Sequence, residues 1–355
     1  MGASVTVKDV AREAEVSVGT VSRVFNNHQN VAEEIRQRVL KAAAELGYTR
    51  PIHQDAARNG SRAIKEIGFL YCSIDALDTN AVASNPFWSH ILHGVESEAR
   101  KTNIKVTYRT ISALTSTPHL LLSTIQDMRL GGILLVGPAE LETIQQIRTL
   151  KTPLVLVDNY APRLSIDAVL GDNFEGARAA VDYLIEQGHR RIAFIGGPTL
   201  PGPRPLNRIY TLERRAAGYR TALLDAGLPV NYELFESCNL DPESGYAACK
   251  RLLQRNASFT ALFCANDETA IGAMKALREA GLRIPDDVSL IGFDDIALVE
   301  HLTPALTTVR VPKEALGAMA VKQLLTRAAD PDMVGVSSVL EVELIKRASV
   351  ASCRA

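Results

Sequence analysis

The chain contains 355 residues, which is enough for two or three domains of about 150 residues each. Its composition, 46% apolar and 22% charged, excludes disordered, collagen-like and coiled-coil chains. The net charge of −1 gives no global argument for nucleic-acid binding, so local patterns have to decide the function. No apolar run predicts a membrane span or a secretory signal. The five scattered cysteines indicate reduced thiols of a cytoplasmic protein and no disulfide or zinc framework.

The first 48 residues predict three helices and no strand. Thr6 can cap the first helix, with Asp9 at its third position in a capping box, and Ser17 can cap the second. A short turn separates these two helices, and a third amphipathic helix follows. This is the helix-turn-helix arrangement, whose second helix enters the major groove of DNA. The helices are expected at 7–14, 18–25 and 33–46.

The second helix has one apolar face and one face suited to DNA. Val21, Val24 and Phe25 form a narrow core-facing stripe. On the other side Arg23 can bind guanine through two hydrogen bonds, a contact worth about 1–3 kcal/mol of discrimination. Val18 can touch a thymine methyl group, and Gly19 allows close approach of the backbone. The predicted phosphate donors are Thr6, Ser17, Thr20, Ser22, Asn26 and Asn27. The alternative is a three-helix packing domain with an exposed arginine.

After a polar stretch at 49–64, short aliphatic runs alternate with helical patterns. Continuous apolar strands between amphipathic helices predict parallel sheets covered on both faces. The βα units are too many for one sheet, so we expect two similar α/β lobes with a ligand cleft at the carboxyl ends of their strands. The strands are expected at 67–71, 104–108, 132–136, 154–157, 168–170, 192–195, 261–264 and 288–293, and the helices at 87–102, 141–150, 174–187, 213–226, 243–254 and 267–280.

The segment from Val7-Lys8-Asp9-Val10-Ala11 to Val21-Ser22-Arg23-Val24-Phe25-Asn26 resembles the signature of the LacI/GalR (lactose repressor/galactose repressor) family. The resemblance continues in the family's order through Ile67-Gly68, Asn85-Pro86-Phe87, Asp158, Asp172-Asn173, Arg215, Gly218-Tyr219, Asn266-Asp267, Gly292-Phe293-Asp294-Asp295 and Leu306-Thr307-Thr308-Val309. It implies an all-α, lambda-repressor-like helix-turn-helix headpiece and a two-lobed sensor domain of the periplasmic-binding-protein-like fold, whose chain crosses between the lobes three times.

On this basis we expect a DNA-binding domain at 1–48, a hinge or linker at 49–64 with a short helix at 52–58, and a two-lobed domain at 65–355. The first lobe is expected at about 65–162 and 295–325, and the second at about 163–294 and 326–355. The expected function is a sequence-specific transcriptional regulator, a repressor in the first place, that acts as a homodimer on double-stranded operator DNA. A small ligand between the lobes is expected to control its DNA affinity.

Three positions depart from the family's pattern. Ala32 stands where a Ser or Thr usually caps the third helix, and Arg50-Pro51 follows Tyr48-Thr49 where the family has Tyr-x-Pro-Asn. Ala57 occupies the place of the leucine that wedges into the minor groove, and a methyl group is a poor wedge. We therefore expect weaker kinking of the DNA or a hinge that works differently. Tyr48, Ala57 and Arg58 complete the predicted DNA-binding set, with Arg58 on the minor-groove phosphates.

The predicted ligand site combines aromatic and polar side chains. Phe87 and Trp88 begin a helix and can present an aromatic face, and Arg215 resembles the family's cleft arginine. Asp158 and Asp294 each end a strand, where a carboxylate reaches into the cleft. Helix capping or an exposed helix position explains many such residues equally well. The full predicted set is Phe87, Trp88, Asp158, Asn159, Asp172, Arg215, Asn266 and Asp294.

The ligand expected from this set is a neutral, polyhydroxylated molecule such as a sugar. Relatives often follow the aspartate at 158 with arginine, and Asn159 in its place argues against an anionic group at that position. The Pro-rich segment at 196–205 is open to two interpretations, a lid over the ligand or a surface loop. No cofactor or metal is expected, since His90 and His93 lack a third ligand.

Two other functions are compatible with parts of the pattern. A solute-binding protein of a transporter has the same lobes, but the added helices and the missing signal sequence oppose it. A Rossmann-like enzyme is opposed by the absence of glycine-rich phosphate-binding and nucleophile motifs. A dimer is preferred to a tetramer, because the residues from 340 to 355 lack leucine heptads.

Overall fold

A computed structural model of the chain describes residues 6–25, 31–46, 48, 64–73, 85–197, 209–255 and 258–353. Its internal contacts separate two units, of which the larger comprises 64–113, 130–145 and 152–355. The smaller unit contains the N-terminal helices together with 114–129 and 146–151. The expected linker helix at 52–58 and most of the Pro-rich loop lie outside the described residues.

The N-terminal helices form a small three-helix domain. They are α1 (Val7–Glu13), α2 (Val18–Phe25) and α3 (Glu33–Glu45), each within one residue of its predicted bounds. The Asp9 carboxylate accepts a hydrogen bond from the Thr6 backbone N–H at 2.9 Å, and the Ser17 hydroxyl accepts one from the Thr20 backbone N–H at 3.0 Å. Both predicted caps are therefore present, whereas Ala32 at the start of α3 makes no side-chain cap.

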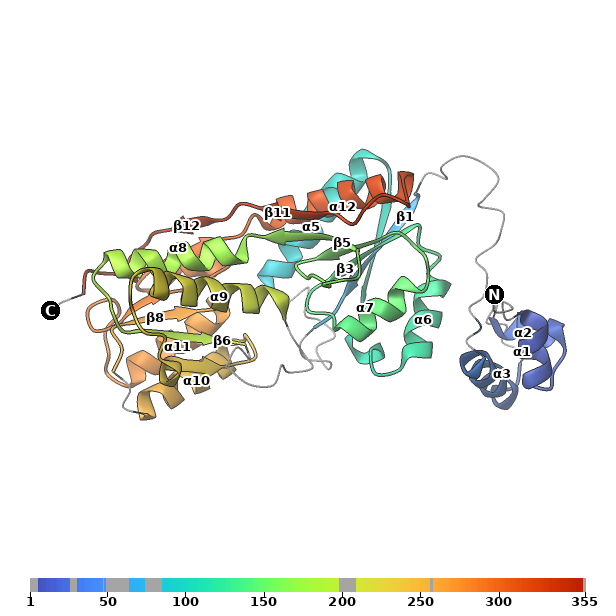
Figure 1. The fold of residues 1–355 in the computed structure, drawn as a ribbon, viewed down its shortest axis with the longest axis horizontal. Helices are drawn as coiled ribbons and strands as arrows, with labels where there is room; N and C mark the ends of the chain where they lie inside the picture. Colours follow the sequence, from blue (N-terminus) through green and yellow to red (C-terminus); the bar gives the residue numbers. More distant parts are fainter. Residues whose placement is uncertain are drawn as a thin grey trace. The chain divides into compact units, whose positions relative to one another are not determined.

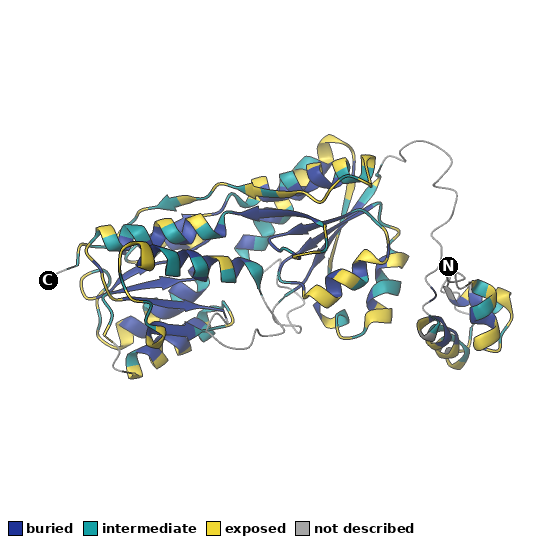
Figure 2. Ribbon diagram, in the orientation of Figure 1, coloured by how far each residue is buried: buried dark blue, intermediate teal, exposed yellow. Residues whose placement is uncertain are grey.

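The core of this domain is built from aliphatic residues of all three helices. Val10, Val21 and Val39 are fully buried, one from each helix. Val24 is also buried, which confirms the core-facing side of α2 at Val21 and Val24, whereas the side chain of Phe25 lies outside the described part of the chain. Since Val18, Gly19 and Arg23 are exposed on the same helix, the predicted outward face is confirmed at these positions. Figure 2 shows both exposed and buried residues along the N-terminal helices.

The larger unit contains two parallel sheets. The first has the strand order β11-β5-β4-β3-β1-β2 and the second the order β7-β6-β8-β9, while β10 and β12 form an antiparallel pair (Figure 1). The strands of the first sheet are β1 (Glu66–Tyr71), β2 (Lys105–Thr110), β3 (Gly132–Val136), β4 (Leu154–Val157), β5 (Asp167–Gly171) and β11 (Ser337–Leu340). The others are β6 (Ile192–Gly196), β7 (Phe235–Ser237), β8 (Ala261–Cys264), β9 (Ser289–Ile291), β10 (Thr308–Arg310) and β12 (Glu343–Ile345).

Helix pairs pack beside the sheets of both lobes. In the first lobe α5 (Pro86–Lys101) packs on α12 (Lys313–Ala329), and in the second α8 (Asn173–Glu186) packs on α9 (Tyr210–Asp225) and α10 (Pro242–Gln254) on α11 (Asp267–Glu279). The remaining helices are α6 (Pro118–Asp127), α7 (Leu141–Arg148) and the 3-10 helices η2 (Ser112–Leu114), η3 (Tyr232–Leu234) and η4 (Ala297–His301). No helix in the described part of the chain is long and apolar enough to span a bilayer.

Each helix pair approaches closely at a glycine. A Cβ added to Gly94 of α5 would lie 2.1 Å from the backbone oxygen of Glu314 in α12, and one added to Gly218 of α9 would lie 2.2 Å from that of Phe174. At Gly272 of α11 the corresponding distance to the Pro242 oxygen is 2.0 Å. Because these contacts are to backbone atoms, any larger side chain would force the helices apart.

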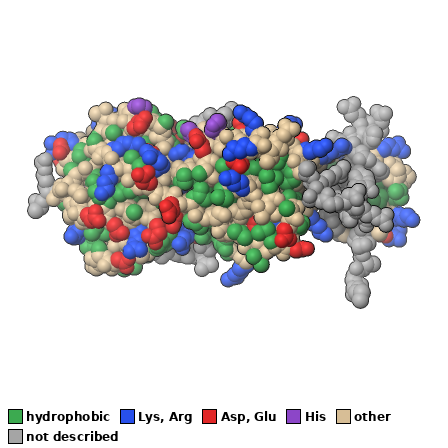
Figure 3. Space-filling view, turned by 90° about the horizontal axis from the view of Figure 1, so that it is seen from above, with side chains coloured by type: hydrophobic (Ala, Val, Ile, Leu, Met, Phe, Trp, Pro, Cys, Tyr) green, Lys and Arg blue, Asp and Glu red, His purple; other side chains and the backbone are tan. Residues whose placement is uncertain are grey.

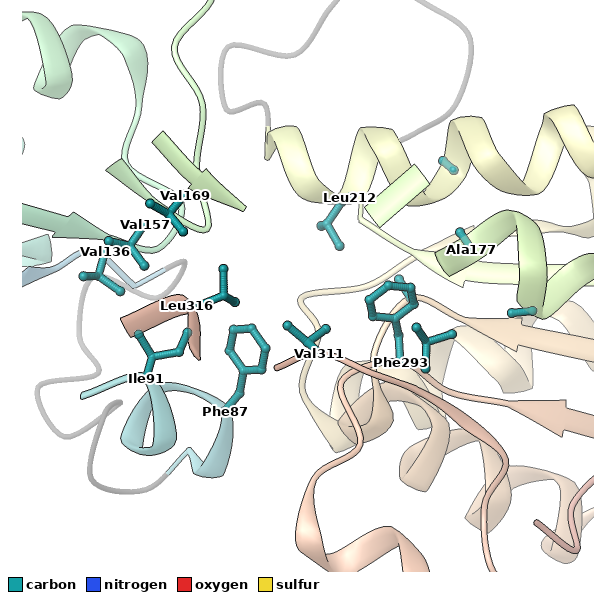
Figure 4. Packing of buried hydrophobic residues seen from close by; sticks show 14 of the residues in the cluster. Phe87, Ile91, Val136, Val157, Val169, Ala177, Leu212, Phe293, Val311 and Leu316 are labelled. Carbon is teal, nitrogen blue, oxygen red and sulfur yellow. The ribbon is translucent and has the colours of Figure 1, made fainter. Parts of the chain in front are cut away.

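The apolar core of the first lobe extends to the second. Val136, Val157 and Val169, from three neighbouring strands, lie beside Ile91 and Leu316 of α5 and α12 (Figure 4). The same cluster continues through Phe87 and Val311 to Leu212, Ala177 and Phe293 of the second lobe. The lobes therefore share a continuous apolar contact. The surface shown in Figure 3 intersperses acidic and basic side chains.

The chain passes between the two sheets three times, as the family resemblance implied, but all three expected lobe boundaries are wrong. β5 and β11 pair with each other in the first sheet, although both were assigned to the second lobe. β10 pairs with β12 beside the second sheet, whereas residues 295–310 were assigned to the first lobe. The crossings therefore follow β5, β10 and β11. Lobe membership depends on hydrogen-bonded neighbours far along the chain, which a local pattern does not encode.

Candidate functional site

A cavity of about 550 Å³ lies between the two lobes, at the carboxyl ends of their strands. Six of the eight residues predicted for the ligand site line it. Phe87, Trp88 and Asp158 come from the first lobe, and Arg215, Asn266 and Asp294 from the second. The wall also contains side chains outside the predicted ligand set, chiefly Tyr71, Asn85, Thr211, Leu212, Asn239, Leu240, Asp241 and Glu268.

Arg215 is the buried cation of the site. It projects from α9, where its Nε donates a hydrogen bond to Asn173 Oδ1 at 2.7 Å and its Nη1 donates one to the Ala265 carbonyl oxygen at 2.6 Å. Nη2 lies 3.1 Å from Asp294 Oδ1, and the guanidinium carbon lies 3.8 Å from the centre of the Phe293 ring. Arginine suits this place because its planar fork binds several acceptors at once and stacks on aromatic rings.

Two aspartates follow strand ends and face the cavity. Asp158 follows β4 with φ of 54°, and Asp294 lies beyond β9 with φ of 106°. Residues other than glycine rarely adopt these backbone conformations, and those that do are concentrated at functional sites. Burial raises the pKa of Asp158 to about 7. The positive charge of Arg215 lowers this pKa, and the negative charge of Asp294 raises it. Burial also raises the pKa of Asp294, while Arg215 and Lys313 oppose it.

The aromatic wall begins at the N-terminus of α5. Asn85 caps the helix by accepting a hydrogen bond from the Phe87 backbone N–H at 2.9 Å, and Pro86 occupies the first position. Phe87 is buried and packs edge to face on Trp88, with 4.8 Å between the two ring centres. The ring centres of Tyr71 and Trp88 are 5.2 Å apart. The capping interpretation and the ligand-facing interpretation of this segment are thus compatible.

Two contacts join the lobes beside the cavity. The Asn85 side-chain amide donates a hydrogen bond to Glu268 Oε2 at 3.1 Å. The rings of Tyr160 and Tyr210 are 4.9 Å apart. Burial, reinforced by the charges of Asp294 and Asp241, raises the pKa of Glu268 to about 7. Sequence reasoning missed Glu268, because nothing local indicates that residues 85 and 268 meet.

Two predicted ligand residues do not line the cavity. Asn159 donates a hydrogen bond to the Ala139 carbonyl oxygen and accepts one from the Tyr160 backbone N–H, so it shapes the loop after β4. Asp172 caps α8 by accepting from the Glu175 backbone N–H at 3.1 Å. Its neighbour Asn173 is the residue that contacts Arg215. Asn266 lines the cavity and also caps α11.

The predicted DNA-binding residues fall into four groups. Val18, Gly19 and Arg23 form an exposed face of α2. Thr6, Ser17 and Thr20 lie at helix starts, where the last two hydroxyls are hydrogen-bonded to each other at 2.8 Å. Tyr48, also predicted to bind DNA, is only 7% exposed and packs in the three-helix core, so in this structure its side chain supports the domain from within. Asn26, Asn27, Ala57, Arg58 and the side chain of Ser22 lie outside the described part of the chain.

The comparisons with known proteins match both parts of the chain. The family model for bacterial regulatory proteins of the lacI family matches residues 6–51, and that for the periplasmic binding protein-like domain matches 181–350. The probable HTH-type transcriptional repressor ExuR of Bacillus subtilis (strain 168) is 33% identical over 98% of both chains. The repressor CytR of Escherichia coli (strain K12) is 34% identical over 97% of this chain and 96% of its own length.

Solved structures show the same organisation. The complex of the regulator CelR with cellobiose matches with a TM-score of 0.73 and 29% identity, over 97% of this chain and 99% of the other. The lac repressor dimer bound to operator and the anti-inducer ONPF matches with a TM-score of 0.67 and 27% identity, over 98% and 100%. Family models, full-length relatives and complete structures agree with the three-helix domain and the two-lobed unit, and the chain belongs to the lacI family of bacterial regulatory proteins.

Proposed function

We propose that this chain is a homodimeric, cytoplasmic repressor of transcription whose operator affinity is set by a small polyhydroxylated ligand in the interlobe cavity. The observation that carries the proposal is the presence, in one chain, of an exposed helix-turn-helix face and of a cavity whose wall comes from both lobes. Support comes from the lac repressor structure, which is a dimer on operator DNA, and from the CelR complex with cellobiose.

The proposed division of labour follows the chain. Residues 1–48 bind DNA, and residues 49–64 link this domain to the two-lobed domain. Residues 65–355 bind the ligand and form the dimer. Arg23 on the exposed face of α2 reads base edges together with Val18, and Gly19 admits the backbone to the groove. A ligand that binds one arrangement of the lobes more tightly than the other shifts the population of DNA-binding dimers by that difference in affinity.

The ligand residues proposed are Phe87, Trp88, Asp158, Arg215, Asn266 and Asp294, with Glu268 and Asn85 added by the geometry. Carboxylates and amides accept and donate hydrogen bonds to hydroxyls, and an aromatic wall covers the apolar face of a sugar ring. Arg215 acts in this arrangement mainly by fixing Asn173 and Asp294, because three of its nitrogen atoms already contact protein acceptors.

Replacing Arg23 with alanine tests the DNA-binding face. We expect Arg23→Ala to weaken binding to a fragment selected from genomic DNA by about 5- to 150-fold, the equivalent of 1–3 kcal/mol, and to weaken binding to random DNA far less. Fluorescence anisotropy at fixed salt measures both affinities. The matched control is Lys41→Ala, which removes an exposed cation of α3. Equal losses on selected and random DNA would show that Arg23 contacts only phosphates.

A further inference from the structure

We propose that the interlobe cavity binds a polyol that carries a positively charged amino group, and that it rejects anionic polyols. The inference deepens the proposed function, on which it rests, because it names the ligand class of the same cavity. The charges of the lining residues, their partners and their burial support this ligand class.

The cavity wall is acidic. Four carboxyl side chains line it, those of Asp158, Asp241, Glu268 and Asp294, against a single cation among the described lining residues, Arg215. The guanidinium group of Arg215 already forms an ion pair with Asp294 and donates hydrogen bonds to Asn173 and Ala265. An anionic ligand would therefore face several carboxylates and, among the described residues of the wall, no cation without a partner.

Two of the four carboxyls have compensating partners. Asp241 caps α10 by accepting a hydrogen bond from the Ser244 backbone N–H at 2.7 Å, at the positive end of the helix dipole. Asp294 pairs with Arg215, and Lys313 donates hydrogen bonds to the carbonyl oxygens of Asp294 and Asp295 close by. These two carboxyl groups thus each have a compensating partner within the protein, although burial still raises the pKa of Asp294.

Asp158 and Glu268 lack such balance, and they belong to opposite lobes. Asp158 is only 8% exposed, lines the cavity, and its carboxylate accepts no hydrogen bond from any residue that the structure describes. Glu268 accepts one hydrogen bond, from the neutral amide of Asn85. A buried carboxylate without an ion-pair partner is costly, so burial raises the pKa of both groups to about 7, and the charge of Arg215, which is paired with Asp294, only partly offsets this rise at Asp158. An ammonium group in the cavity would supply the missing counter-charge.

The rest of the wall fits the polyol part of the ligand. Asn85, Asn239 and Asn266 contribute side-chain amides, and Thr211 contributes a hydroxyl. Phe87 and Trp88 supply the apolar surface. A volume of about 550 Å³ lies within the usual range for small-ligand sites. Asn159 adds no cation beside this wall, because an amide side chain is neutral, and its amide is hydrogen-bonded to the backbone of Ala139 and Tyr160.

The test uses matched sugars that differ in charge. For the gluco, galacto and manno configurations, the neutral hexose is compared with its 2-amino-2-deoxy and 6-amino-6-deoxy derivatives and with its uronate, by titration calorimetry with the full chain at pH 7. We expect at least one amino sugar to bind about tenfold more tightly than its neutral counterpart, and the uronates about 100-fold more weakly. A neutral hexose or a uronate as the best ligand, or binding by no member of the panel, would overturn the proposal.

Variants of Asp158 and Glu268, the two carboxyl groups without a compensating partner, test whether these groups cause the preference for amino sugars. Asp158→Asn and, independently, Glu268→Gln are expected to reduce the ratio of amino-sugar to hexose affinity by about tenfold. The control Asp182→Asn removes a carboxylate on the outer side of α8 and leaves the ratio unchanged. An unchanged ratio in both cavity variants would overturn the charge assignment. Operator binding without sugar is measured in parallel, because its loss would reject the proposed function, whereas its persistence confines a negative result to the ligand class.

Discussion

Replacing Arg215 with alanine is expected to lower the free energy of unfolding of the two-lobed unit by about 3–5 kcal/mol and to abolish its response to ligand. The substitution leaves Asp294 without its ion-pair partner, and it leaves Asn173 Oδ1 and the Ala265 carbonyl oxygen without their donor. It also removes the cation that opposes the raised pKa of Asp158. A buried charge that loses its partner costs more than the pair contributes.

Urea denaturation followed by circular dichroism measures the stability, and calorimetry measures ligand binding. The adjacent Arg214 provides the matched control, because it is exposed and lies over the Phe174 ring at 4.7 Å from its centre. Arg214→Ala is expected to cost less than about 1 kcal/mol. Arg215→Lys keeps the charge but not the planar fork, and we expect it to recover only part of the loss. Equal stability of the two alanine variants would contradict the assigned role of Arg215.

Raising the pH from 5 to 8 is expected to destabilise the ligand-free two-lobed unit through Asp158. The pKa of this group is about 7 in the folded protein, above the unfolded value of 3.8, so the folded state binds more protons between these values. Stability present at low pH is therefore lost as the pH rises through 7. A shift of about three units corresponds to at most about 4 kcal/mol. The raised pKa of Glu268 acts in the same direction.

The matched variant Asp158→Asn isolates this contribution. We expect its free energy of unfolding to vary less with pH than that of the unchanged protein and to exceed it at pH 8. His189 acts in the opposite direction in both proteins, because burial lowers its pKa and its neutral form is favoured on folding. The difference between the two pH profiles cancels that contribution. Parallel profiles would show that Asp158 does not hold a proton near neutral pH.

Much of the fold was predictable because local physics determines it. The caps at Thr6 and Ser17 place α1 and α2, and continuous apolar runs place the central strands within one or two residues, as at Gly132–Val136. The short strand β11 was missed because its exposed and half-buried residues alternate at the sheet edge, where Val339 is 56% exposed, so it lacks a continuous apolar run. α12 was also missed, since its buried face includes the small residues Gly317 and Ala320, which give a weak apolar pattern.

The site was predictable where a residue follows a strand or begins a helix. Asp158, Asn266 and Asp294 occupy such places, and parallel strands bring their carboxyl ends to one edge. Asn159 and Asp172 were wrong as cavity residues because side chains adjacent in sequence point in different directions. The hydrogen bond between Asn85 and Glu268 joins residues 183 positions apart, and only the packed lobes bring them together. Pairing of this kind is a property of tertiary structure.

The central claim is that one chain joins sequence-specific DNA binding to ligand binding between its lobes. The most direct test is a titration of a labelled, genome-selected DNA fragment with the full chain, repeated with saturating ligand and with random DNA. We expect the affinity for the selected fragment to exceed that for random DNA by at least about a thousandfold. We also expect the affinity for the selected fragment to change when ligand is added. Equal affinity for selected and random DNA, unaffected by a ligand that calorimetry shows to be bound, would contradict it.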